Sequence, residues 1–164
     1  MISNILRKKS FSFERTYPAP VATVWDAWTR AEMLREWWGP EKTTIPDCEV
    51  DARVGGRIYV VTEAGEAMGK YQGTRWPMEG TFSVVEPTTR LTYDAVSWTE
   101  GEEESTRIDH VNDVTLQADG SGTLLRLEVD ILKVGSKAKL ASFGMKWGYK
   151  SQLDALTELL ERNV

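Results

Sequence analysis

The sequence predicts an α+β fold in which a long C-terminal helix packs into a curved antiparallel sheet. From Ile45 onward, strand-like segments follow one another across short turns, which is typical of an antiparallel meander rather than of βαβ units. The segment 138–162 instead repeats its apolar residues at helical spacing. Because the 164 residues contain no repeat and no interior linker, we expect one domain, 11–164, preceded by a flexible leader, 1–10.

The N-terminal part of that domain predicts one strand and two short helices. Residues 11–17 alternate as a strand does, and prolines then end the segment. A helix follows because apolar residues recur at helical spacing from Val21 to Trp28. A second short helix is predicted over 31–37, where Gly39-Pro40 stops it. The seven tryptophans of the chain either pack against the sheet or line a pocket.

Strands make up most of the remaining chain. We predict them near 45–52, 56–63, 67–73, 78–86, 90–98, 106–117 and 122–132. The strongest hairpin signal is Asp119-Gly120-Ser121-Gly122, because Asp-Gly supplies the positive φ that such turns require. The two-residue period of a strand places these side chains on the inner face: Ile58, Val60, Phe82, Val84, Leu91, Tyr93, Ile108, His110, Asn112, Val114, Leu116, Thr123, Leu125, Leu127, Val129 and Ile131.

The final helix is apolar on two sides. One face carries Met145, Tyr149, Gln152, Leu153, Leu156, Leu159 and Leu160. Leu140, Phe143 and Trp147 fall on nearly the opposite side. Three explanations remain open: the first half is held on two sides, the helix kinks near Gly144 or Gly148, or these three side chains form an exposed patch for self-association as a homodimer.

Composition excludes several function classes. The net charge of −5 has the wrong sign for nucleic acid or for an anionic membrane, so neither partner is predicted. A lone cysteine, Cys48, cannot form an internal disulfide and favours a cytoplasmic location. With one histidine and one cysteine, no metal site and no cofactor is predicted. No phosphate-binding loop, nucleophile elbow or signal peptide is recognisable.

Several sequence pieces together resemble a known family. They are Tyr17-Pro18-Ala19-Pro20 with Val24-Trp25-Asp26-Ala27-Trp28, Trp37-Trp38-Gly39-Pro40, Asp51-Ala52-Arg53-Val54-Gly55-Gly56-Arg57, Gly80-Thr81-Phe82 with Val85-Glu86-Pro87 and Arg90-Leu91-Thr92-Tyr93, and Trp147-Gly148-Tyr149. In this order they resemble the activator of Hsp-90 ATPase homologue (AHSA-like) family of the START-like superfamily, also called SRPBCC or Bet v 1-like.

The resemblance implies a β-α-α-β6-α helix-grip fold, in which the last helix closes an apolar cavity against the sheet. It implies six strands after the helices where the pattern gives seven, so we expect 67–73 and 78–86 to form one strand bent around Trp76-Pro77. The family's namesake is a eukaryotic co-chaperone with an additional N-terminal domain. This sequence shows no counterpart of that domain, which argues against a chaperone partner. Many single-domain members resemble small-molecule binders.

We therefore predict non-catalytic binding of an apolar or amphipathic small molecule between the sheet and the C-terminal helix. The candidate cavity residues are Trp38, Ile58, Phe82, Tyr93, His110, Asn112, Leu125, Leu127, Met145 and Tyr149. His110 and Asn112 stand out as polar residues among aliphatic ones; they either orient a ligand or are satisfied structurally near a strand end. The alternatives are a chaperone-associated interaction module, and an enzyme of cyclase or hydrolase type that uses His110 in the same cavity.

Overall fold

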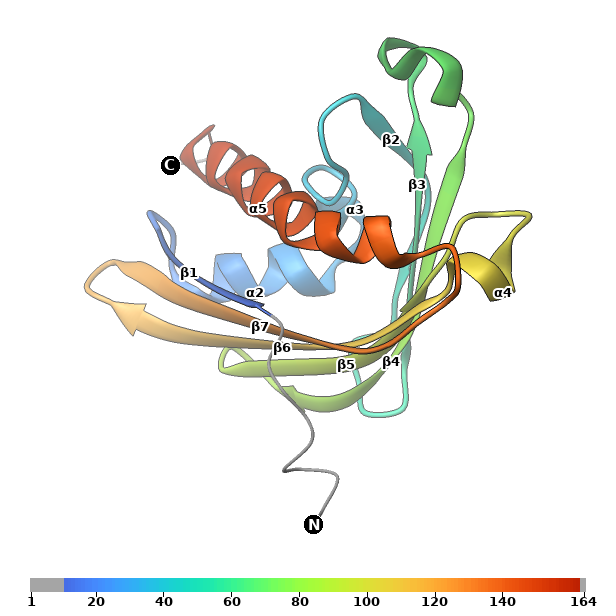
Figure 1. The fold of residues 1–164 in the computed structure, drawn as a ribbon. Coiled ribbons are helices and arrows are strands. Elements are labelled where there is room, and N and C mark those ends of the chain that lie inside the picture. The colour runs from blue at the N-terminus through green and yellow to red at the C-terminus, as the bar shows by residue number, and fades with distance from the viewer. Residues whose placement is uncertain (1–10, 163–164) are drawn as a thin grey trace.

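A strongly curved antiparallel sheet forms the body of the molecule, and the C-terminal helix lies across its concave side (Figure 1). The computed structural model describes residues 11–162, so the predicted leader, 1–10, lies outside the described residues. The elements are β1 (Phe11–Tyr17), α2 (Val21–Thr29), α3 (Ala31–Leu34), β2 (Thr43–Val50), β3 (Arg57–Ala64), η1 (Glu66–Tyr71), β4 (Arg75–Glu86), β5 (Arg90–Ser97), α4 (Glu103–Thr106), β6 (Ile108–Asp119), β7 (Gly122–Val134) and α5 (Lys139–Arg162). The predicted α+β class and the β-α-α-β6-α order are confirmed, because six strands follow α3.

The strand order explains why two helices sit where they do. The sheet runs β1-β7-β6-β5-β4-β3-β2, so the first two strands in sequence occupy opposite edges. The chain between them must therefore cross the open side of the curved sheet. α2 and α3 make this crossing: α2 contacts β6 and β7, and α3 contacts β2. All other strands pair with their sequence neighbours, as the short turns predicted.

Three tryptophans hold this crossing against the core. Trp28, Trp37 and Trp38 contact one another edge to face, with ring centroids 4.8 to 6.2 Å apart. The indole Nε1 of Trp37 donates to the backbone oxygen of Ala27 at 2.9 Å, which ties the end of α3 to α2. Burial of large apolar side chains contributes about 1.5–3 kcal/mol each. Trp28 and Trp37 therefore pack in the core, as one of the two interpretations held. Trp38 also lines the cavity described below.

The strand predicted over 67–73 is wrong. Residues Glu66–Tyr71 form the short 3-10 helix η1, and Gly69 within it has a φ of 58°. The expected bent strand is wrong too, because β4 begins only at Arg75 and continues unbroken through Trp76 and Pro77. The segment belongs to a turn that projects beyond the sheet and has no fully buried side chain, so a strand there would have no buried face.

Two smaller boundaries also differ. The second helix ends at Leu34 rather than near 37, and irregular turns lead to Trp38. Along β4 the pairing with β5 shifts by one residue after Phe82, so Val84 lies opposite Thr92 on the outer face and Val85 turns inward. The predicted inward position of Val84 is therefore wrong, because one extra residue in a strand reverses every later side chain.

Helix α5 has two unlike halves. Its fully buried side chains are Tyr149, Leu153, Leu156, Leu159 and Leu160, all in the second part of the helix. The part before Tyr149 has none, and there the three apolar side chains of the opposite side, Leu140, Phe143 and Trp147, are 85%, 70% and 69% exposed. The three side chains therefore form an exposed patch, as the third explanation requires, and the use of this patch for self-association stays a prediction. Within residues 11–162, no helix is long and apolar enough to cross a bilayer.

Candidate functional site

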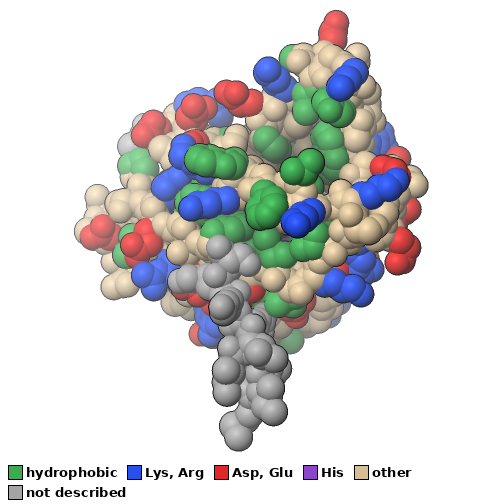
Figure 2. All heavy atoms as spheres, in the orientation of Figure 1, with side chains coloured by type: hydrophobic (Ala, Val, Ile, Leu, Met, Phe, Trp, Pro, Cys, Tyr) green, Lys and Arg blue, Asp and Glu red, His purple; other side chains and the backbone are tan. Residues whose placement is uncertain are grey.

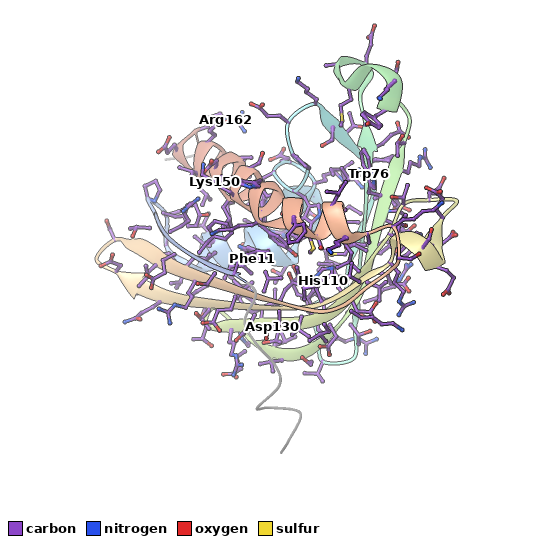
Figure 3. The ribbon with its side chains drawn as sticks, in the orientation of Figure 1. Phe11, Trp76, His110, Asp130, Lys150 and Arg162 are labelled. Carbon is purple, nitrogen blue, oxygen red and sulfur yellow. The ribbon has the colours of Figure 1, made fainter. Side chains whose placement is uncertain are left out.

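The main cavity lies under the projecting first half of α5. Its volume is about 410 Å³, and its walls come from α5, from the ends of β4 and β5, and from the segment that follows Trp38. The large apolar side chains that line it are Trp38, Met68, Trp76, Met78, Trp98, Ile108 and Met145. Figure 3 places Trp76 across from α5, and His110 beneath the same helix. Ligand sites of proteins range from roughly 300 to 1,000 Å³ and are mostly apolar.

Three of the ten predicted cavity residues line this space directly: Trp38, Met145 and Tyr149. The aliphatic and aromatic residues predicted from the strands lie in the solid core instead: Ile58, Phe82, Tyr93, Leu125 and Leu127. His110 and Asn112 are buried as their parity indicated, at 1% and 0% exposure. Neither residue lines the cavity. His110 contacts Ser97 and Asn112 contacts Tyr149, and these two partners line it.

Sequence reasoning missed much of the wall. Ser97, Trp76 and Trp98 come from strand ends, and Met68 comes from η1. Period-two reasoning describes the middle of a sheet, whereas this cavity forms at the rim where strands give way to turns. A signal was present in the sequence: Trp76 lies between two predicted strands and Trp98 at the end of another, both outside the inner-face pattern.

A chain of buried polar side chains joins one wall of the cavity to the other. The Ser97 hydroxyl contacts His110 Nε2 at 2.9 Å, and His110 Nδ1 contacts Asn112 Nδ2 at 2.9 Å. The Tyr149 hydroxyl donates to Asn112 Oδ1. Ser97 and Tyr149 both line the cavity. β5, β6 and α5 thus hold one continuous polar network whose two ends reach the same space.

This network fixes the proton on the histidine. Asn112 Nδ2 can only donate, so His110 Nδ1 is the acceptor and the ring proton lies on Nε2, which donates to Ser97 Oγ. Burial lowers the pKa of His110 to about 4, although the charge of Asp109 opposes this shift. Burial also raises the pKa of Tyr149. Both groups are therefore neutral at physiological pH.

Two polar atoms beside the cavity differ in their access to a ligand. Because Ser97 Oγ accepts from His110, its own hydroxyl proton can be donated elsewhere. Gln152 lines the cavity from α5, and its buried Oε1 has no hydrogen-bond partner within the described part of the chain. Leaving a buried acceptor unpaired costs roughly 1–3 kcal/mol. The wall therefore offers the Ser97 hydroxyl as a donor within apolar surroundings, whereas Gln152 Oε1 is shielded from the open space.

Two glycines keep the α5 side of the cavity open. Gly144 and Gly148 line the space, and a Cβ added at either position would meet no heavy atom within 4 Å. The fold therefore does not require their small size. Glycine inside a helix destabilises it by roughly 0.5–1 kcal/mol relative to alanine. The helix carries this cost twice, at the positions where larger side chains would occupy the cavity.

The Ser97–His110 contact is not arranged as a nucleophile and its base. A serine nucleophile needs a histidine nitrogen that accepts its proton, whereas His110 Nε2 already carries one and donates. A pKa of about 4 also makes this imidazole a weak base at neutral pH. Among residues 11–162, no three His, Cys, Asp or Glu side chains are grouped so as to hold a metal ion.

Known proteins share both the sequence pattern and the fold. A family model described as "Activator of Hsp90 ATPase homolog 1-like protein" matches residues 18–161. A structure from Chromobacterium violaceum is 21% identical with a TM-score of 0.73, covering 92% of this chain and 96% of that one. One from Nitrosomonas europaea is 27% identical with a TM-score of 0.70, covering 93% and 94%.

A structure from Rhodobacter sphaeroides is 20% identical with a TM-score of 0.72, covering 92% of this chain and 91% of that one. Likeness at about 20% identity carries the fold and nothing finer. No curated protein matches the chain.

Proposed function

The chain belongs to the family of Activator of Hsp90 ATPase homolog 1-like proteins, and from this premise we propose that it binds an apolar or amphipathic small molecule in the cavity beneath α5. The family's fold suggests either a ligand-binding or a chaperone-associated module. The observation that favours ligand binding is the space itself: about 410 Å³ walled mainly by tryptophan, methionine and isoleucine side chains.

The wall also indicates the chemistry of the ligand. Its body is apolar, because aromatic and aliphatic side chains surround it. It carries a group that accepts a hydrogen bond from the Ser97 hydroxyl, which lines the space. Any charged group of the ligand lies at the rim of the cavity, where Lys137 and Glu41 are exposed.

A graded filling of the cavity tests this proposal. An environment-sensitive apolar dye such as anilinonaphthalene sulfonate reports occupancy, and an aromatic and lipid library is then screened by its displacement. Gly148→Ala should leave binding within about three-fold of the wild type. Gly144→Leu combined with Gly148→Leu should lower dye affinity at least ten-fold, since two leucine side chains add volume where the fold leaves space.

The matched control places leucines elsewhere on the same helix. Glu158→Leu with Glu161→Leu adds similar apolar surface at exposed positions that do not line the cavity. This variant should bind the dye as the wild type does. Equal binding by the cavity-filled and wild-type chains would show that the dye binds elsewhere. Failure of every library compound to displace the dye from the wild type would contradict the proposal.

The Ser97–His110 contact also allows a direct test of the enzymatic alternative. A fluorophosphonate probe modifies serine hydroxyls that a neighbouring base activates. Because His110 donates to Ser97, we expect no labelling of Ser97 after prolonged exposure, as judged by intact-mass spectrometry. Labelling that Ser97→Ala abolishes would favour a hydrolase. The proposal includes a cytoplasmic location, which the unpaired and buried Cys48 supports.

A further inference from the structure

The outer face of the first half of α5 carries an apolar stripe. Leu140, Phe143 and Trp147 are 85%, 70% and 69% exposed, and at 100° per residue they fall within an arc of about 60°. Figure 2 shows hydrophobic side chains gathered on this side of the molecule between basic ones. Single exposed apolar residues are ordinary, but three large ones on adjacent helical turns indicate an interaction surface.

Positive charge is concentrated on the same stretch of chain. Residues 131–150 contain five lysines and no aspartate or glutamate, although the whole chain has a net charge of −5. Lys139, Lys146 and Lys150 lie along one flank of the apolar stripe at helical spacing. Lys150 pairs with Asp154 at 3.0 Å. Lys139 and Lys146 have no acidic partner among residues 11–162 and are exposed.

We propose that this face docks onto an anionic lipid bilayer. A helix that lies in the bilayer interface combines tryptophan, phenylalanine and leucine on one side with lysines beside them. Indole rings favour the interfacial region, and lysine stems extend so that their ammonium groups reach lipid phosphates. The net charge predicts no membrane partner, but it averages over the chain, whereas a bilayer meets only the face turned toward it.

The observations favour a bilayer over the other occupants. A second copy packed in parallel along this stretch would bring the same lysines and no carboxylates from residues 131–150 to meet them. A protein that inserts an apolar helix needs a groove, whereas the stripe lies on the convex outer side of α5. The proposal does not depend on the cavity ligand.

The second half of α5 limits how the helix can lie on the lipid. Asp154, Glu158 and Glu161 are exposed and continue along the same side of the helix. Their charges are repelled by anionic headgroups. We therefore expect only residues 139–150 to touch the bilayer, with the C-terminal end of α5 tilted away from it.

Vesicle co-sedimentation of the full chain tests the docking face. We expect the chain to sediment with vesicles of about 70% phosphatidylcholine and 30% phosphatidylserine, and to remain in solution with phosphatidylcholine alone. Each lysine near such a surface contributes about five-fold in affinity, so Lys139→Glu with Lys146→Glu should weaken binding at least twenty-fold. Phe143→Ser with Trp147→Ser should weaken it at least ten-fold. Added salt should reduce binding.

The control variant changes the net charge equally on another surface. Arg53→Glu with Lys70→Glu lies at exposed positions far from α5 in the sequence and outside the stripe. It should keep vesicle affinity within about three-fold. All substituted side chains are exposed, so thermal unfolding should be nearly unchanged for each variant, which separates loss of docking from loss of fold.

Several results would overturn the proposal. Failure of the wild type to sediment with either vesicle would do so, as would a loss of binding by the control variant as complete as that of the lysine variant. A dimer in sedimentation velocity that Phe143→Ser with Trp147→Ser dissociates, without vesicle binding, would assign the face to a second copy. Retention on immobilised polyglutamate without vesicle binding would assign it to an acidic protein.

Discussion

The buried polar network shows how single residues serve both stability and the cavity. His110, Asn112 and Tyr149 find hydrogen-bond partners in one another and in Ser97, so these three buried side chains avoid the cost of an unpaired polar group. Strand parity predicted that His110 and Asn112 point inward, and this is confirmed. Their partners could not be predicted, because Ser97 and Tyr149 come from other elements and meet them only in three dimensions.

The histidine makes stability depend on pH. Its folded pKa of about 4 lies below the ordinary value of 6.5, so the unfolded chain binds a proton more readily than the folded one. Stability is complete above pH 6.5 and is lost as pH falls toward 4. At pH 4.5 the loss from this group is on the order of 2–3 kcal/mol. Urea unfolding of the wild type and of His110→Gln should show this difference.

Glutamine is the appropriate comparison because it keeps one donor and one acceptor but does not titrate in this range. The wild type should lose stability relative to His110→Gln as pH falls, since acidic residues titrate alike in both. His110 is the sole histidine of the sequence, so its NMR titration can be read without overlap. A titration midpoint near 6.5 in the folded protein would contradict this prediction.

A second residue-scale prediction concerns the tyrosine hydroxyls. Tyr149→Phe removes the donor to buried Asn112 Oδ1 and should cost roughly 1–3 kcal/mol of unfolding free energy. Tyr17→Phe removes a longer bond, 3.3 Å, to the backbone oxygen of Leu153. It should cost less, about 0.5–1 kcal/mol. Equal losses in chemical denaturation would argue that the network adds nothing beyond an ordinary hydrogen bond.

Among the elements, α5 departs furthest from an ordinary amphipathic helix. Its second half fits the predicted apolar face, and its first half extends beyond the core above the cavity. The sequence predicted the two apolar sides but could not choose among three arrangements, because an exposed stripe and a doubly buried one have the same pattern. The misassigned segment 67–73 and the shift after Phe82 have a similar cause: local alternation does not reveal where the sheet ends or bulges.

The glycines of α5 give an element-scale prediction. Gly144→Ala and Gly148→Ala should each raise the unfolding free energy by about 0.5–1 kcal/mol, because an added methyl group meets nothing. Thermal unfolding should shift upward by about 1–4 °C each. Gly56→Ala is the opposite case, since its Cβ would collide with the backbone oxygen of Asp51. A loss of stability in the α5 variants would refute the assignment.

Hydrogen exchange should divide α5 in two. Residues 143–148 have no fully buried side chain, whereas the helix from Tyr149 onward is fixed by buried leucines. Amides of the first half should therefore exchange at least ten-fold faster than those of 153–160. A dye bound in the cavity should slow exchange in the first half alone. Uniform protection along the helix would show that the projecting half is as firmly held as the rest.

At the scale of the whole molecule, the meander and the final helix were predictable because they depend on local turns and periodicity. The sequence predicted an apolar cavity between the sheet and the helix but not the position of that cavity. It lies at the sheet's rim, where α5, η1 and the ends of β4 and β5 meet, and such a meeting depends on sheet curvature that no local pattern encodes. Residues predicted from mid-strand positions accordingly belong to the solid core.

One stretch of α5, residues 139–148, both covers the cavity and carries the exposed stripe. Two equilibria that share a structural element are thermodynamically linked. If a ligand in the cavity orders this segment, it changes the affinity of the stripe for the bilayer by some factor. Bilayer binding must then change the affinity for the cavity ligand by the same factor. Binding and release of the ligand would then depend on whether the protein is on a bilayer, with no separate signal.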